Sequence, residues 1–147
     1  MQLRIKQHQQ QRPADWHTFE EPYHPLAVLK KHQHEYQTWL LECLTLYISN
    51  LFFAETADKE IGETFDASAI QASILQEIDR LTEFIQAAPL DLIIVTNEVG
   101  WGIVPGDPLS RAYSDIIGKV NQKLAQAAEE VYLVALGIPL QLKPQSR

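Results

Sequence analysis

A short apolar run at residues 92–95 leads directly into a polar segment, T-N-E-V-G-W-G-I-V-P, at residues 96–105. The run has the length and the β-branched residues of a buried strand. The two glycines, the asparagine and the glutamate that follow it are typical of a loop at the end of a strand. Ligands bind beside the carboxyl ends of strands in open α/β sheets. We therefore expect a long loop over residues 96–108 that contacts a ligand.

Strand-like and helix-like segments alternate along the rest of the chain. Apolar runs predict further strands at 38–45, at 131–136 and, after a turn at Gly137, at 138–142. The run at 38–45 is continuous, which favours a buried strand over a half-exposed one. Helical patterns are present at 3–12, at 26–36, at 46–54, from a cap at Asp66 or Ser68 to Pro89, and at 109–129. This order predicts an α/β domain with a parallel sheet and helices on its faces.

Length and charge restrict the class of protein. The 147 residues are enough for one domain with a real core, so we expect residues 1–147 to form a single domain. The formal net charge of −7 argues against non-specific binding of nucleic acid. The single cysteine, Cys43, excludes an internal disulfide and fits a reducing compartment. With neither a membrane-spanning run nor the apolar core of a signal peptide, the chain is expected in the cytoplasm.

The helix predicted at 109–129 carries an unusual charge in its first turn. Arg111, Asp115, Gly118 and Gln122 share one face at spacings of three and four. A cation at this end opposes the helix dipole, which favours anions there. Arg111 therefore fits an anionic ligand or a nearby carboxylate. The alternative is a surface ion pair with Asp115, worth only a few tenths of a kcal/mol.

Arg4, His8 and Arg12 are spaced by four residues, so a helix would place them on one side. A neutral imidazole can attack phosphorus, and flanking guanidinium groups would neutralise phosphate charge. The spacing fits a covalent phosphohistidine-type intermediate. The alternative is a histidine exposed on a glutamine-rich surface.

Three segments, taken in order, resemble the family of bifunctional adenosylcobinamide kinase / adenosylcobinamide-phosphate guanylyltransferases. The first is R-I-x-x-H-x-x-x-R-P-x-x-W-x-T-x-E at residues 4–20, and the second is L-L-E-C-L-T at residues 40–45. The third is the segment at 96–105, followed by R-x-x-x-D-x-x-G-x-x-N-Q at residues 111–122. Together these segments span most of the chain.

The resemblance implies a place in cobalamin biosynthesis. Family members phosphorylate adenosylcobinamide and then transfer GMP from GTP to adenosylcobinamide phosphate through a guanylyl-histidine intermediate. The implied substrates and cofactors are GTP, ATP and Mg²⁺, and the implied assembly is a homo-oligomer, a trimer in the family. The implied fold is the α/β P-loop NTPase (RecA-like) three-layer fold with a parallel sheet.

The resemblance also assigns roles to residues. His8 matches the histidine that receives GMP, and Glu20 matches an acid whose carboxylate would accept hydrogen bonds from guanine. Glu42 matches the acid that serves Mg²⁺ and phosphate, with a carboxylate merely facing water as the alternative. The implied nucleotide contacts are Gln9, Gln10, Gln11, Arg12, Glu20 and Glu42, although the family usually has a more varied stretch than three glutamines. The implied phosphate or substrate contacts are Arg4, Asn97, Glu98, Gly100, Gly102 and Arg111.

One expected motif does not occur in these residues. Family members begin with a strand, a phosphate-binding loop G-x-x-x-x-G-K-S/T, a helix and a second strand, and this chain contains no such loop. A unit of that kind takes at least about 30 residues. We therefore expect a sheet without its central strand, uncovered apolar surface, and weak kinase and guanylylation activity.

Two interpretations of that expectation stay open. The encoded enzyme is complete and this chain starts at an internal methionine, or the chain is a catalytically impaired remnant that retains nucleotide binding or partner association. Two interpretations of Trp101 also stay open: an exposed platform for a ligand, or an anchor that packs the loop on the sheet.

Overall fold

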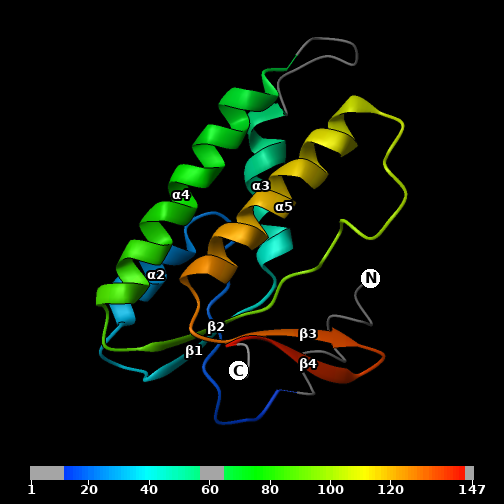
Figure 1. The fold of residues 1–147 in the computed structure, drawn as a ribbon. Coiled ribbons are helices and arrows are strands. Elements are labelled where there is room, and N and C mark those ends of the chain that lie inside the picture. Colours follow the sequence, from blue (N-terminus) through cyan, green and yellow to red (C-terminus); the bar gives the residue numbers. More distant parts are fainter. Residues whose placement is uncertain (1–11, 57–64, 145–147) are drawn as a thin grey trace.

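The computed structural model describes residues 12–56 and 65–144. Four helices and four strands follow one another in this part of the chain (Figure 1). In chain order they are α2 (Pro25–His32), β1 (Thr38–Leu41), α3 (Leu44–Thr56), α4 (Ala67–Ala87), β2 (Asp91–Ile94), α5 (Pro108–Ala127), β3 (Val131–Ala135) and β4 (Ile138–Lys143). The predicted helix at 3–12 falls largely outside the described residues, as do Arg4, His8, Gln9, Gln10 and Gln11.

Strands β1 and β2 form a parallel two-stranded sheet, as the alternating pattern predicts. Backbone bonds continue the pairing past β1, where Val95 N donates to Leu41 O at 3.0 Å and Leu44 N donates to Val95 O at 2.9 Å. The strand predicted at 38–45 is therefore shorter than expected, because the chain turns at 42–43 and Leu44 already begins α3.

The expectation that this strand is buried on both faces is wrong. Exposure alternates along β1 and β2, and only one face packs on the helical core, through Leu41 and Ile94. On the opposite face Leu40 is 41% exposed and Ile93 is 55% exposed. Figure 1 shows the reason: α3, α4 and α5 lie on one side of this sheet. The described residues thus form one helical layer on one sheet layer.

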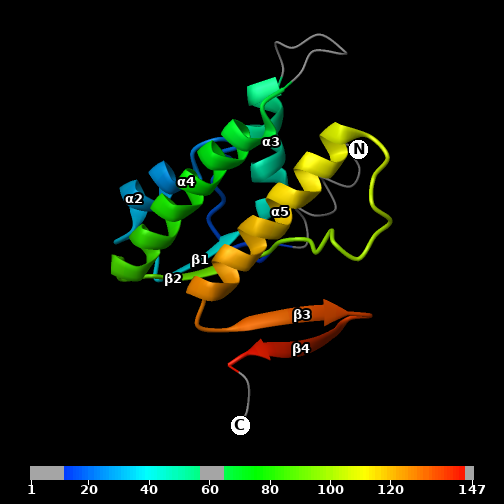
Figure 2. The ribbon, with the colours of Figure 1, turned by 45° about the horizontal axis from the view of Figure 1, so that its top comes forward.

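The third predicted strand does not join the parallel sheet in the described residues. β3 pairs with β4 as an antiparallel hairpin that forms a separate two-stranded sheet (Figure 2). Leu136 and Gly137 make the turn with φ values of 55° and 76°. Two residues with positive φ match the twist of a tight hairpin, which accounts for the glycine. Lys143 Nζ donates to Gln126 O at 2.8 Å and so fixes the hairpin to the end of α5.

The core lies between α3, α4 and α5, where apolar side chains recur at helical spacing. Its buried members include Leu44, Ile48 and Phe52 of α3, Ile70, Ile74 and Ile78 of α4, and Ile116, Ile117 and Val120 of α5. Asp66 caps α4, as expected, by accepting from Ser68 N and Ala69 N at 3.0 Å. None of the helices in the described ranges is long and apolar enough to cross a membrane.

Candidate functional site

The carboxyl ends of β1 and β2 lie side by side because the two strands are parallel. At this edge the turn after β1 contacts the first residues of the loop after β2. Asn97 N donates to Thr45 Oγ1 at 3.0 Å, and its amide Nδ2 lies 3.3 Å from the same oxygen and 3.7 Å from Cys43 Sγ. The loop predicted to contact a ligand therefore starts from a fixed point at the sheet edge.

Asn121 of α5 completes this group of contacts. Its Oδ1 accepts from Thr96 Oγ1 at 2.8 Å, and its Nδ2 donates to Asn97 O at 3.0 Å. Tyr113, also on α5, donates from its hydroxyl to Thr45 O at 3.1 Å. The sequence marked Asn121 only as part of a motif and gave Thr45 no role of its own. The signal that could have found them is their position, Thr45 just after the turn that ends β1 and Asn121 on the helix that follows the loop.

The rest of the loop is largely exposed. Glu98 Oε1 accepts from Gly100 N at 2.7 Å, which turns the carboxylate back toward its own loop. A Cβ atom added at Gly100 would lie 2.8 Å from the same oxygen, so any other residue there would displace the Glu98 side chain. Trp101 is 75% exposed, which excludes the anchor interpretation for this residue in the structure. Glycine at position 100 therefore matters for where the Glu98 carboxylate lies.

The carboxylate nearest in effect to Arg111 is that of Asp107, and contact of Arg111 with an anionic ligand stays a prediction. Arg111 itself binds the loop backbone. Its Nη1 donates to Pro105 O at 2.9 Å and to Gly106 O at 2.6 Å, in place of a pair with Asp115. The α5 terminus has an anionic cap in Asp107, which accepts from Ser110 N at 2.8 Å. That bond, a further one from the Ser110 side chain and the nearby Arg111 charge lower the pKa of Asp107. Arg111 thus closes the end of the loop onto the helix that follows it.

A hollow of about 340 Å³ lies between the first turns of α4 and α5. Its lining includes Ser68 and Gln71 from α4 together with Arg111 and Asp115 from α5. The guanidinium of Arg111 already binds two loop carbonyls, so the hollow adds only a polar surface beside the loop.

Glu42 follows β1 directly and is exposed at the edge described above. Among the described residues, no three histidine, cysteine or acidic side chains are grouped so that they could hold a metal ion. Mg²⁺ usually binds through one or two carboxylates, with waters and substrate phosphates as the remaining ligands. One carboxylate at a strand end is compatible with that kind of site and not with an all-protein cage.

A second hollow, of about 370 Å³, lies in the segment before α2. Arg12, Trp16, Thr18 and Glu20 are among its lining residues, and Arg12 Nη1 donates to Thr18 Oγ1 at 3.2 Å. This places two of the predicted nucleotide contacts, Arg12 and Glu20, around one concave surface. A guanidinium, a carboxylate and an indole are suited to phosphate, polar base edge and base face respectively.

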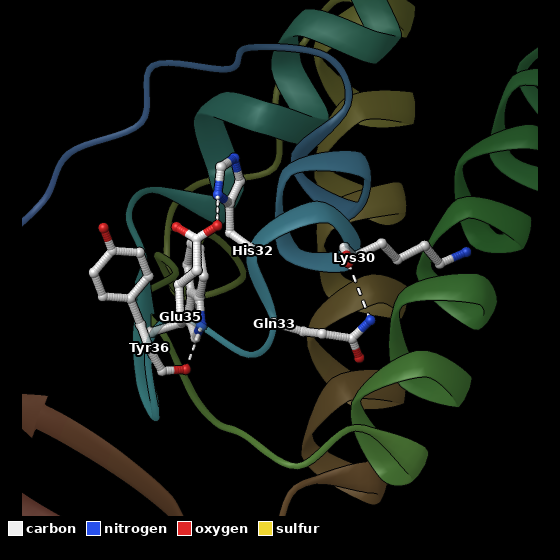
Figure 3. A network of polar contacts seen from close by, with 6 residues as sticks. Lys30, His32, Gln33, Glu35 and Tyr36 are labelled. Carbon is white, nitrogen blue, oxygen red and sulfur yellow. Dashed lines mark hydrogen bonds and ion pairs between the residues drawn. The ribbon is translucent and has the colours of Figure 1, made fainter.

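The segment that carries Glu20 is attached to the sheet by aromatic rings. Phe19 stacks on Trp39 of β1 with ring centroids 5.5 Å apart and meets His32 of α2 at 4.7 Å. The corner between α2 and β1 is itself fixed: His32 Nδ1 lies 2.9 Å from Glu35 Oε1, and Trp39 Nε1 donates to Tyr36 O at 3.2 Å (Figure 3). The residue next to Glu20 is thereby attached to the strand that ends at Glu42.

Comparison with known proteins identifies the family of the chain. The family model described as cobinamide kinase / cobinamide phosphate guanyltransferase matches residues 1–142. The bifunctional adenosylcobalamin biosynthesis protein CobU of Escherichia coli (strain K12) is 41% identical over 143 residues, which cover 97% of this chain and 78% of that protein. CobU of Salmonella typhimurium has the same identity and coverage. CobP of Pseudomonas aeruginosa is 34% identical over 143 residues and 75% of its length is covered. The chain belongs to the cobinamide kinase / cobinamide phosphate guanyltransferase family.

Proposed function

We propose that this protein acts in cobalamin biosynthesis, phosphorylating adenosylcobinamide and transferring GMP from GTP to adenosylcobinamide phosphate. The observation that carries this proposal is the family match over residues 1–142, with relatives 34–41% identical that are named as bifunctional adenosylcobalamin biosynthesis proteins. An α/β arrangement supports it, with Glu42 and Asn97 beside the carboxyl edge of a parallel sheet and Arg12 and Glu20 lining a hollow before α2.

The guanylyl step runs through His8. A ring nitrogen of the neutral imidazole attacks the α-phosphorus of GTP, so a nitrogen–phosphorus bond forms as the bond to the β-phosphate oxygen breaks and pyrophosphate leaves. A phosphate oxygen of adenosylcobinamide phosphate then attacks the same phosphorus, and the nitrogen–phosphorus bond breaks. The imidazole regains its starting form. Arg4 and Arg12, four residues to either side, are the cations suited to the phosphate charge.

The hollow before α2 is the proposed nucleotide-binding surface. Arg12 approaches phosphate and Glu20 accepts hydrogen bonds from the N1 and N2 groups of guanine, which favours GTP over ATP for this step. Gln9, Gln10 and Gln11 supply further polar contacts. Trp16 lines the same hollow and has the flat apolar face that a purine needs.

The kinase step uses the edge where β1 and β2 end. Glu42 is the proposed Mg²⁺ and phosphate residue, and the proposed substrate contacts are Asn97, Glu98, Gly100, Gly102 and Arg111. When bound, Mg²⁺ neutralises phosphate charge. The exposed loop of residues 96–107 is the surface that meets adenosylcobinamide, with ATP or GTP as the phosphate donor.

The finer fold that we propose is the P-loop NTPase (RecA-like) three-layer fold, with residues 1–147 as part of a single domain. Residues 1–147 contain no G-x-x-x-x-G-K-S/T loop, and a strand–P-loop–helix–strand unit would supply that loop and a central strand. Two observations support this. The uncovered face of β1 and β2 is apolar at Leu40 and Ile93, and β3 pairs with β4 in a separate two-stranded sheet and not with β1 or β2.

The same two observations favour a second candidate function. A sheet face that exposes Leu40 and Ile93, and a hairpin outside that sheet, leave room to bind a partner chain, including further copies of this one. In this alternative it is a catalytically impaired remnant that retains nucleotide binding or partner association. The family's homo-oligomer, a trimer, is the assembly we propose for the active form.

Labelling with GTP separates the two candidates. The purified protein is incubated with GTP that carries a radioactive α-phosphate and Mg²⁺, then denatured and analysed for label on the protein. We expect an acid-labile, alkali-stable label on a peptide that contains His8, and its transfer to added adenosylcobinamide phosphate. His8→Asn should abolish the label, and His17→Asn should leave it unchanged.

Three outcomes are distinct. Labelling at His8 followed by transfer supports the enzyme. GTP binding by calorimetry without any label supports the impaired remnant and contradicts autonomous guanylylation. Neither labelling nor binding of GTP would overturn both candidates.

A further inference from the structure

Asn121 makes two hydrogen bonds of opposite polarity to consecutive residues of the loop after β2. Its Oδ1 accepts from Thr96 Oγ1 at 2.8 Å while its Nδ2 donates to Asn97 O at 3.0 Å. A side-chain amide presents an acceptor and a donor side by side in this way, which an ionised carboxylate cannot do. A carboxylate of nearly the same shape would place an oxygen against the Asn97 carbonyl. The contact therefore depends on the amide and not merely on a polar residue.

Thr45 contacts the same two loop residues from α3. Its Oγ1 accepts from Asn97 N at 3.0 Å and from Asn97 Nδ2 at 3.3 Å, and it lies 3.4 Å from Thr96 Oγ1. Thr45 in turn is held by Tyr113, whose hydroxyl donates to Thr45 O. Residues from the first turn of α3 and the middle of α5 thus enclose the start of the loop.

These contacts concern the loop and not the core. Asn97 is exposed and Thr45 and Asn121 are partly exposed, whereas the buried side chains of α5 are Ile116, Ile117 and Val120. A hydrogen bond of this kind contributes about 0.5–1.5 kcal/mol net, small beside the apolar packing of the three helices. Losing one of these hydrogen bonds should loosen residues 96–97 at the start of the loop without unfolding the domain.

We propose that Asn121 and Thr45 are positioning residues that fix Thr96 and Asn97, and so aim the loop of residues 96–107 at the corrinoid substrate. Their polar atoms bind the side chain of Thr96 and the backbone and side chain of Asn97, so they act through these two loop residues. The inference rests on the proposed function only for the identity of the substrate. The fixing of the loop is a property of this chain alone.

The test compares four variants of the full protein. Asn121→Asp keeps the shape and removes the donor, while Thr45→Val removes the acceptor from Asn97 N. Thr45→Ser keeps the hydroxyl and is the conservative rescue. Gln126→Glu is the matched control, because it makes the same amide-to-carboxylate change at an exposed position of α5.

Two measurements are made on each variant. Hydrogen exchange of the peptide that spans residues 96–104 reports the loop without any ligand, and we expect it to rise by about tenfold in N121D and T45V, as the loss of one hydrogen bond allows. Calorimetric titration with cobinamide should show a dissociation constant raised by about tenfold in the same two variants. T45S and Q126E should match the wild-type protein in hydrogen exchange and in cobinamide affinity. The affinity for GTP should stay the same in all four variants.

Unchanged exchange in N121D and T45V would overturn the inference. So would an equal loss of cobinamide and GTP affinity together with a lowered melting temperature, since that indicates a general structural role. If the wild-type protein binds no cobinamide, the proposed substrate is wrong. The exchange measurement still decides whether these residues fix the loop.

Discussion

Leu40 and Ile93 are register partners in the parallel β1–β2 sheet, and both lie on the face that the helices leave uncovered. Side chains alternate along a strand, so their neighbours Leu41 and Ile94 point the other way into the core. The covered face of this sheet is apolar, and the exposed face carries Leu40 and Ile93 beside the polar Thr38 and Asp91. The two side chains leave part of their apolar surface in contact with water on this face.

The first prediction concerns this difference between the two faces. Leu40→Ala should lower the free energy of unfolding by about 1 kcal/mol or less, because much of the side chain is already in water. Ile48→Ala should cost about 2–5 kcal/mol, because Ile48 is fully buried in α3. Urea unfolding of both variants provides the measurement. Equal costs would mean that the outer face is covered in solution.

The second prediction concerns Asp107, whose pKa is lowered from the ordinary 3.8 mainly by the hydrogen bond from Ser110 N. A lowered pKa in the folded state stabilises the fold above pH 3.8, and the contribution disappears as the pH falls through the lower folded value. Asp107→Asn keeps a capping oxygen without the charge. Melting curves of both proteins should differ at neutral pH and converge below pH 3.8. A difference that persists in acid would contradict this assignment.

The third prediction concerns Tyr47, where burial, and secondarily the negative charge of Glu77, raise the pKa to about 12. The raised value favours the protonated phenol in the fold, so its contribution is complete below pH 10 and is lost as the pH rises from 10 toward 12. Tyr47→Phe cannot ionise and should lose less stability over that range. Unfolding at several alkaline pH values compares the two. Parallel losses would show that another group is responsible.

The fourth prediction concerns Arg111, whose guanidinium binds the carbonyls of Pro105 and Gly106. Arg111→Ala should lower stability by about 1 kcal/mol and increase hydrogen exchange over residues 100–107. Arg111→Lys, with a single charged nitrogen, should retain part of the protection. Arg80→Ala, which removes only an exposed pair with Glu77, is the control for loss of a surface cation. Faster exchange over the same residues in R80A would argue that the bonds from Arg111 to the loop carbonyls have no specific effect.

The sequence predicted the described elements well where a local signal exists. Helix α4 begins at the expected cap, Asp66, and ends before Pro89, because capping and the absence of a proline N–H act over a few residues. The turn at Gly137 follows from the positive φ that glycine permits. The strand at 38–45 was predicted too long and too buried, because an apolar run does not reveal which side of it will be covered.

For the candidate site, the sequence likewise indicated which residues to consider but not what they contact. Motif residues identified Asn97, Glu98 and Arg111, but not what each side chain would contact. Arg111 was expected beside an anionic ligand or a carboxylate; it binds two backbone carbonyls near the Asp107 carboxylate, and its contact with a ligand stays a prediction. Thr45 and Asn121 had no assigned role, because their partners lie 52 and 24 residues away in the chain. Only folding brings such groups within hydrogen-bonding distance.

The sequence by itself determined the element order, the family and the candidate nucleophile, because periodicity, caps and motif spacing are local properties of the chain. The tertiary structure decided which sheet face is covered, that β3 pairs with β4 instead of the parallel sheet, and that Asn121 and Thr45 enclose the start of the loop. These features depend on how α3, α4 and α5 pack, and packing is a relation between distant segments that no single segment encodes.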